Sequence, residues 1–200
     1  MAKFGFLILL SLCAALIAQQ QARAEDSDKP LLLVASPGLM NPEYRQAVLL
    51  AVPAANGGHI GLILNKPTQH SLASLFPKQE ASKKVIEPVF FGGPFSANAL
   101  IAAMQTHDSP GPGCVAMMED VFLVVHVSTI DEIIEQRPNA ARYYLGYVAW
   151  QPGELREELK RGLWTVRDAD AGVVFRKDVE NLWLELMRSS QKVTASLSLQ

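Results

Sequence analysis

Short apolar runs separated by polar breaks dominate the chain from residue 30 to residue 188. Apolar runs bounded by Gly, Pro, Asn or Ser are typical of strands buried on both faces. Residues 99–104 are also apolar and fit a strand or a helix. The turn signal Asn56-Gly57-Gly58 predicts that the second and third strands form a hairpin. The predicted strands are residues 31–35, 47–52, 59–64, 88–91, 121–127, 143–150 and 164–167.

Helical spacing appears in the stretches between these strands. A helix is predicted from the capping box Thr129–Glu132, and a second one from Pro152-Gly153 to Gly162. A third is capped by Asp178, because apolar residues recur at helical spacing over residues 179–187. Weaker helical signals occur at Asn41-Pro42 and at residues 71–76.

The order of these elements indicates an α+β fold with a mixed sheet flanked by helices. Unequal helices and an early hairpin argue against a doubly wound parallel sheet. No internal repeat or low-complexity linker divides the chain, so a single domain is predicted at residues 31–187, after a short lead at residues 25–30. Residues 188–200 are polar and rich in Ser, and are expected to form a disordered tail.

Residues 1–24 have the pattern of a secretory signal peptide. Lys3 supplies the positive start, Phe4–Ala18 is an almost unbroken apolar run of 15 residues, and Ala22-Arg23-Ala24 is a typical cleavage site. Cleavage between Ala24 and Glu25 is therefore predicted, with export to the periplasm or the medium. A spanning helix needs roughly 20 apolar residues, so no membrane association is expected after cleavage.

The charge balance narrows the classes of partner. The chain carries 18 basic and 20 acidic residues, a formal net charge of -2. Such a balance gives no basic footprint, so neither nucleic acid nor an anionic membrane is an expected partner. The two cysteines, Cys13 and Cys114, cannot form a disulfide framework, and loss of the leader would leave Cys114 alone.

Four motifs in a fixed order carry a resemblance to a known family. The first is Leu31–Leu39 followed by Asn41-Pro42, and the second is Gly61–Thr68, a strand ending in Asn, Lys, Pro and Thr. The third is the loop Phe91–Pro94, and the fourth is the segment Gly146–Leu155. Together they resemble the AlgH/YqgE family, a largely uncharacterised bacterial family, over residues 31–187.

The resemblance implies an α+β fold whose mixed sheet is strongly bent and barrel-like. It implies little about activity, although some members are labelled transcriptional regulators. The chain departs from the family at Asn41, where Asp is common, and at Val148-Ala149, which replace small residues. It also departs in its predicted signal peptide, because family members usually begin close to the first strand. An exported copy cannot regulate transcription by touching DNA, so a regulatory role is disfavoured.

Polar residues follow the ends of several predicted strands, where such sheets usually place ligands. If these strand ends are neighbours, their polar groups line one cleft. The alternative is equally consistent with the sequence: Asn65 satisfies loop backbone groups, and the Gly-Gly-Pro loop is a tight turn. The candidate ligand-binding residues are Ser36, Asn65, Lys66, Thr68, Gly92 and Gly93.

No metal site or cofactor is expected. The histidines are not spaced as metal-binding pairs, and no C-x-x-C motif occurs. Ser36 lacks the G-x-S-x-G motif of a hydrolase elbow. The four histidines are His59, His70, His107 and His126.

These observations favour a non-enzymatic, exported protein that binds a small ligand or a protein partner. The alternative is an enzyme that uses a Ser36/Asn65/Gly93 cleft or the thiol of Cys114. In that case Cys114, beside the Pro- and Gly-rich loop at residues 107–113, would need His107 or His126 as its base.

Overall fold

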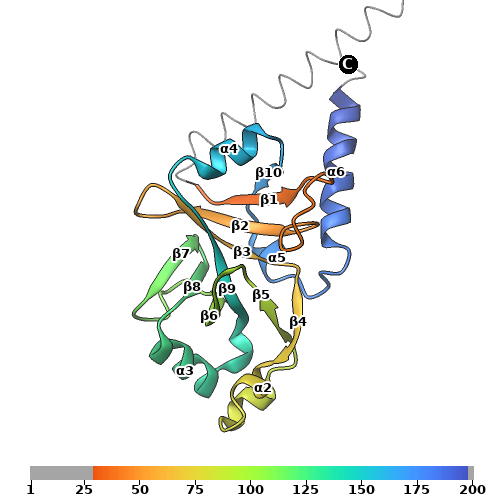
Figure 1. Cartoon of the computed structure of the whole chain (residues 1–200). Coiled ribbons are helices and arrows are strands. Elements are labelled where there is room, and N and C mark those ends of the chain that lie inside the picture. The colour runs from red at the N-terminus through yellow and green to blue at the C-terminus, as the bar shows by residue number, and fades with distance from the viewer. Residues whose placement is uncertain (1–28, 198–200) are drawn as a thin grey trace, which may run out of the picture.

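The computed structural model describes residues 29–197, and its core is a sheet of ten strands (Figure 1). The predicted signal peptide and its cleavage site at Ala24 and Glu25 lie outside the described residues. The strands are β1 (Leu31–Ala35), β2 (Val48–Pro53), β3 (His59–Ile63), β4 (Pro67–Ser71), β5 (Pro88–Phe91), β6 (Phe95–Gln105), β7 (Cys114–Met118), β8 (Val121–Val124), β9 (Ala141–Trp150) and β10 (Trp164–Asp168).

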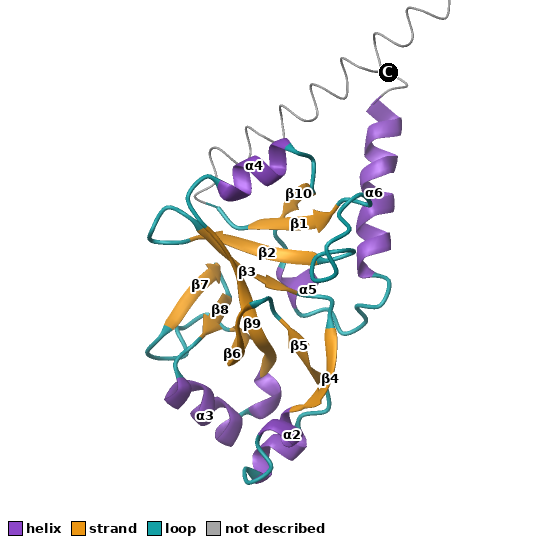
Figure 2. Cartoon of the chain, in the orientation of Figure 1, coloured by secondary structure: helices purple, strands orange, loops and turns teal. Residues whose placement is uncertain are grey.

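Short helices lie around the sheet, and one long helix follows the last strand (Figure 2). Within residues 29–197, none of the helices combines the length and the apolar character needed to cross a membrane. The helices are α2 (Leu72–Leu75), α3 (Val127–Gln136), α4 (Glu154–Lys160), α5 (Ala171–Val174) and α6 (Leu182–Leu197), with the 3₁₀ turns η1 (Glu80–Lys84) and η2 (Pro138–Ala140).

The sheet runs in the order β10-β1-β2-β3-β9-β6-β8-β7, with β5 and β4 branching from β9. Strand β9 joins two halves of the sheet. The upper half consists of β10, β1, β2 and β3, and the lower half consists of β6, β8 and β7 with the branch of β5 and β4. The end of β9 pairs antiparallel with β3, as at His59 and Trp150, while its first part pairs with β6 and, in parallel, with β5. In Figure 1, β1 and β2 therefore run across the view, while β9 and β5 run down it. This is the α+β fold with a bent, mixed sheet that the sequence and the family resemblance predict.

Three apolar clusters fix this curvature. The first fills the inside of the curl, where Leu50, Leu62 and Tyr144 meet Leu182 of α6. The second lies where α4 covers the opposite face of the upper strands, and the third lies between α3 and the lower strands. Each fully buried Leu or Ile contributes about 1.5–3 kcal/mol, so packing on both faces explains the continuous apolar runs in the sequence.

Several predicted elements are confirmed. The hairpin of β2 and β3 turns at Asn56–Gly58, and residues 88–91 form β5. The ambiguous run at residues 99–104 is a strand and belongs to β6. The helix after Pro152-Gly153 is α4, and Gly153 caps it in the left-handed conformation.

Other elements differ from the predictions. Asn41-Pro42 starts a single turn rather than a helix. The Asn41 side chain accepts the Glu43 N–H at 2.8 Å as an N-cap does, but the turn ends at Gln46, which has φ of 55°. Helix α3 begins at Val127, ahead of the capping box, with His126 as its N-cap residue. His126 therefore follows a strand rather than lying in one. The edge strand β4 carries no apolar run that signals it, and β7, which reads CVAMM, is an apolar strand that is not among the predicted ones.

The C-terminal helix begins later and ends later than predicted. Asp178 accepts the Glu180 N–H at 3.3 Å in the preceding turn, and α6 starts at Leu182. The helix continues to Leu197, where the sequence predicts a polar tail from Arg188.

Candidate functional site

Asn65 lies two residues after the end of β3, and its side chain takes part in the hydrogen bonding of the sheet. Its Oδ1 accepts the Val48 N–H at 2.8 Å, and its Nδ2 donates to the Gln46 carbonyl at 2.9 Å. The side-chain amide thus replaces a peptide group at the start of β2. Gln46 takes a left-handed conformation, with φ of 55°, just ahead of this contact.

The amine of Lys66 stabilises the turn at residues 41–46 through hydrogen bonds. Its Nζ donates to the carbonyls of Pro42 at 3.0 Å and Glu43 at 2.8 Å. Burial lowers the pKa of Lys66, the nearby Arg45 lowers it further, and Glu43 opposes the shift. Lys66 is therefore a fixed, half-buried cation.

Thr68 and Ser36 hold neighbouring segments through backbone contacts. Thr68 Oγ1 donates to the Val89 carbonyl at 2.6 Å and accepts the His70 N–H at 3.1 Å, which fixes β4 against β5. Ser36 Oγ donates to the Gly162 carbonyl at 2.5 Å and so ties the end of β1 to the loop after α4.

Gly92 and Gly93 lie at the crossing of the two halves of the sheet. Gly92 donates to the Leu145 carbonyl at 2.8 Å, and its own carbonyl accepts the Ile63 N–H at 2.9 Å. A Cβ at Gly92 would collide with the Gly146 carbonyl, and one at Gly93 with the backbone of Tyr147. The Gly-Gly-Pro loop is thus a tight turn at a crowded corner.

Of the six predicted residues, the structure brings Asn65 and Lys66 into one hollow. This α6 hollow has a volume of about 300 Å³ and opens beside the first turn of α6. Ser36, Thr68, Gly92 and Gly93 do not line it. The α6 hollow is lined by Arg45, Gln46, Asn65, Lys66, Glu180, Trp183 and Leu184.

A larger cavity lies where the two ends of the curled sheet face each other. β7 and β10 are the terminal strands in the hydrogen-bonded order of the described residues, and both contribute to it. This seam groove has a volume of about 840 Å³. The seam groove could not be predicted from the sequence, because β7 is not among the predicted strands. The seam groove is lined by Lys29, Pro30, Leu31, Ala116, Met117, Met118, Glu119, Val166, Asp168 and Ala169.

The histidines and Cys114 do not form a shared site. His107 Nδ1 lies 2.8 Å from Asp120 Oδ1 on the surface, and His126 Nδ1 lies 2.9 Å from Ser128 Oγ. Burial lowers the pKa of His59. The Cys114 thiol makes one long contact, 4.0 Å, to the Pro112 carbonyl. Among residues 29–197, no three His, Cys, Asp or Glu side chains come together in a way that could hold a metal ion.

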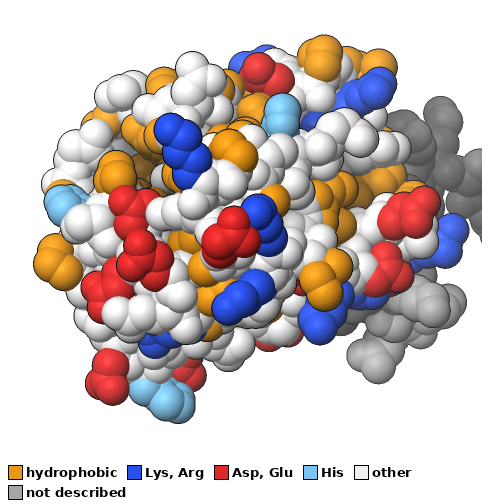
Figure 3. Space-filling model, turned by 90° about the horizontal axis from the view of Figure 1, so that it is seen from below, with side chains coloured by type: hydrophobic (Ala, Val, Ile, Leu, Met, Phe, Trp, Pro, Cys, Tyr) orange, Lys and Arg blue, Asp and Glu red, His pale blue; other side chains and the backbone are white. Residues whose placement is uncertain are grey.

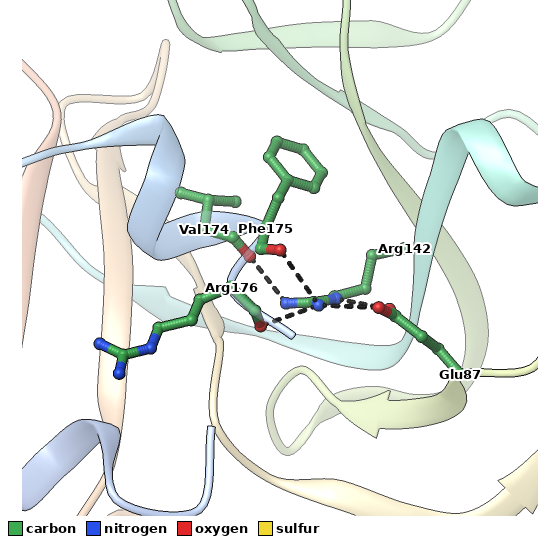
Figure 4. A network of polar contacts seen from close by, with 5 residues as sticks. All are labelled: Glu87, Arg142, Val174, Phe175 and Arg176. Carbon is green, nitrogen blue, oxygen red and sulfur yellow. Dashed lines mark hydrogen bonds and ion pairs between the residues drawn. The ribbon is translucent and has the colours of Figure 1, made fainter. Parts of the chain in front are cut away.

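Arg142 forms a buried polar network that the sequence analysis did not identify. Its side chain is 3% exposed and meets the Glu87 carboxylate through Nε at 3.0 Å and Nη2 at 3.2 Å. It also donates to the carbonyls of Val174, Phe175 and Arg176 at the end of α5 (Figure 4). The network ties β9 to the C-terminal segment, so we assign it a structural role.

Known proteins share this architecture. Residues 32–194 match the family described as AlgH-like. The UPF0301 protein SCO2948 of Streptomyces coelicolor is 31% identical over 163 residues, which cover 78% of this chain and 83% of that protein. The UPF0301 protein CT0663 of Chlorobaculum tepidum is 28% identical over 161 residues, covering 79% and 84%.

Two solved structures have the same fold. The solution structure of the AlgH protein from Pseudomonas aeruginosa aligns with a TM-score of 0.66 and 22% identity, over 84% of this chain and 90% of that one. The crystal structure of protein DIP2367 from Corynebacterium diphtheriae aligns with a TM-score of 0.64 and 19% identity, over 80% and 85%. The family match over residues 32–194 and the shared fold give one conclusion: this chain belongs to the AlgH-like family.

Proposed function

We propose that this protein is a non-enzymatic binding protein, and that the seam groove is its docking surface for an extended segment of a protein partner. The observation that carries the proposal is the position of the groove between the two terminal strands of the sheet. Its volume of about 840 Å³ is within the usual size range of binding sites.

The wall formed by β7 suits an extended peptide. A terminal strand offers backbone N–H and C=O groups that another strand can pair with, whereas a small apolar molecule leaves them to water. The pairing of β7 with β8 shifts between Ala116 and Met118, and this bulge lets three consecutive residues line the groove. Methionine side chains adapt to different apolar partners, so Met117 and Met118 favour a groove that accepts a range of apolar side chains.

A variant pair on β7 tests the docking surface. Ala116 is exposed and lines the groove, so Ala116→Arg fills the groove without removing core atoms. Val115 precedes it on β7, is 36% exposed and does not line the groove, which makes Val115→Arg the matched control. Peptides selected from a random display library should bind the wild type and Val115→Arg but not Ala116→Arg. Equal binding to both variants would contradict the proposal.

The enzyme alternative receives little support from the geometry. The Ser36 and Asn65 side chains already hold backbone groups, and Gly93 packs against Tyr147. Cys114 is partly buried against the third apolar cluster. Thiol- and serine-directed probes applied to the native protein test this alternative. Labelling of Cys114 or Ser36 that blocks turnover of any substrate would replace the binding proposal with an enzymatic one.

We also propose that the protein is exported after cleavage between Ala24 and Glu25. The support is the charged start, apolar run and A-x-A site of residues 1–24. Fractionation of the native host and the intact mass of the protein test this. A species that begins at Glu25 outside the cytoplasm is expected, whereas an unprocessed cytoplasmic species would contradict export.

Binding to nucleic acid is not part of the proposed function. The formal net charge is -2, and acidic and basic side chains are interspersed on the face that carries α2 and α3 (Figure 3). DNA binding depends on a basic footprint that releases counterions. A gel-shift titration of the exported or full-length chain with duplex DNA should show no complex at physiological salt, and a tight complex would restore the regulatory role.

A further inference from the structure

Opposite charges line the α6 hollow without pairing with one another. Arg45 and Glu180 both line it, yet neither side chain forms an ion pair among the described residues. Lys66 contributes a second cation, and two of its three N–H groups are used by the Pro42 and Glu43 carbonyls. The hollow therefore has a cationic side and an anionic side, each able to accept a further charged group.

The walls between these charges are held rigidly. The Trp183 indole N–H donates to the Ala35 carbonyl at 2.7 Å, which fixes the ring, and Leu184 extends the apolar surface beside it. Asn65 is fixed by its two backbone contacts. A site whose side chains are already ordered loses less entropy when a ligand binds.

The backbone at Gln46 adds a separate indication. A non-glycine residue with φ of 55° is uncommon, and such residues cluster at ligand sites. Gln46 lines the hollow, and the Asn65 amide holds its carbonyl. The conformation places the side chains of Arg45 and Gln46 at the same opening.

We propose that the α6 hollow binds a small zwitterion of the α-amino acid class that has an apolar side chain. The carboxylate would meet Arg45 and the remaining N–H of Lys66, the ammonium would meet Glu180, and the side chain would lie on Trp183. A volume of about 300 Å³ is at the lower end of ligand cavities, which suits a single amino acid. The hollow shares no lining residue with the seam groove, so this proposal stands independently of the proposed docking function.

Calorimetric titration of the purified full-length chain tests the proposal, with L-leucine and L-phenylalanine as the probes. Tryptophan fluorescence, to which Trp183 contributes beside Trp150 and Trp164, provides a second readout. N-acetyl-L-leucine lacks the ammonium and isoamylamine lacks the carboxylate, so both should bind at least about tenfold more weakly than L-leucine, the factor expected for one lost charge-assisted contact.

Two exposed charges give a variant test that does not disturb the core. Glu180→Gln should lower the affinity for L-leucine about tenfold and leave the affinity for N-acetyl-L-leucine unchanged. Arg45→Gln should lower the affinity for both probes. Glu135→Gln and Arg156→Gln are the controls, because both residues are exposed and their side chains form no hydrogen bond or ion pair within residues 29–197. Circular dichroism verifies the fold of each variant.

Three results would overturn the proposal. The first is the absence of any heat or fluorescence change with millimolar amino acid. The second is unchanged binding in both Arg45→Gln and Glu180→Gln. The third is equal affinity for L-leucine and its N-acetyl derivative, which would mean that the hollow binds a simple anion.

Discussion

The Arg142 guanidinium connects one carboxylate with three carbonyls, and these contacts hold this buried charge in place. Its position over the Phe90 ring, 4.8 Å from the ring centre, adds a cation–π contact. We expect Arg142→Met to lower the free energy of unfolding by about 2–4 kcal/mol. The carbonyls at the end of α5 lose their donor, whereas the Glu87 carboxylate is 38% exposed and regains water.

Urea denaturation of this variant provides the measurement. Arg156 is exposed on α4, so Arg156→Met should change the free energy of unfolding by less than about 0.5 kcal/mol. Equal effects of the two substitutions would mean that the buried network contributes nothing to stability.

Gly146 lies at the crossing of the two halves of the sheet, where the backbone leaves no room for a side chain. Its φ is 69°, and a Cβ there would collide with the Gly93 carbonyl. We expect Gly146→Ala to lower the free energy of unfolding by at least about 2 kcal/mol, as measured by thermal or urea denaturation. At Gly38 a Cβ would find nothing within 4 Å, so Gly38→Ala should be nearly neutral. A stable Gly146→Ala variant would show that the crossing can relax.

Tyr44 should make the stability of the protein fall as the pH rises above 10. Burial, and next to it the charge of Glu43, raise the pKa of Tyr44 from 10.0 to about 12. The folded state thus holds this proton more tightly than the unfolded state, so the stabilisation is complete below pH 10 and is lost between pH 10 and about 12.

A comparison of the wild type with Tyr44→Phe isolates this residue, because the other tyrosines titrate alike in both proteins. The difference in unfolding free energy should stay constant below pH 10 and then move against the wild type as the pH rises. A constant difference across this range would contradict the raised pKa.

At the scale of elements, one carboxylate connects α4 to two strands of the sheet, in addition to the apolar contacts of Leu155 and Leu159. Glu158 Oε2 accepts the indole N–H groups of Trp150 at 2.9 Å and Trp164 at 2.7 Å. Glu158→Ala leaves two partly buried donors without a partner, at about 1–3 kcal/mol each, and tryptophan fluorescence reports both rings during unfolding. Glu157→Ala is the matched control, because Glu157 only pairs with Lys160 on the surface. Similar losses in the two variants would refute this attachment.

The elements that the sequence predicts well are those with both faces buried. β1 and β2 read as continuous apolar runs because clusters lie on each side of them. Two edge strands are not predicted. β4 reads PTQHS and is mostly exposed, so it carries no apolar signal. β7 reads CVAMM, an apolar run without the alternation of apolar and polar residues expected of a half-exposed edge strand. The start of α3 was misplaced because its N-cap, His126, makes no side-chain capping hydrogen bond and leaves no capping signature.

At the scale of the molecule, the candidate site depends on contacts that local patterns do not contain. Asn65 and Lys66 were identified from their position after a strand, but Arg45 joins them through a turn and Trp183 joins from a helix more than a hundred residues later. The seam groove arises only when the sheet curls and its terminal strands face each other. Sequence reasoning therefore found two of the residues and neither cavity as a whole.

The pairing of β1 with β10 makes folding depend on both ends of the domain. Removal of residues 164–200 takes away β10, α5 and α6, and with them the buried side chains of Val166, Val174, Val179 and Leu182. At about 1.5–3 kcal/mol each, these side chains together contribute about 6–12 kcal/mol, as much as the whole net stability of a typical domain. Arg142 also loses the three carbonyls at the end of α5.

We therefore expect the chain that ends at Leu163 to show no cooperative urea transition by far-UV circular dichroism, although it keeps the ten residues of α3 and the strands β1–β9. Adding a peptide of residues 164–189 should restore a transition, because β10 can pair with β1 in the register Leu33 to Val166. A cooperative transition without the peptide would mean that β1–β9 form an independent folding unit, and that the C-terminal segment is an addition to the fold rather than a part of it.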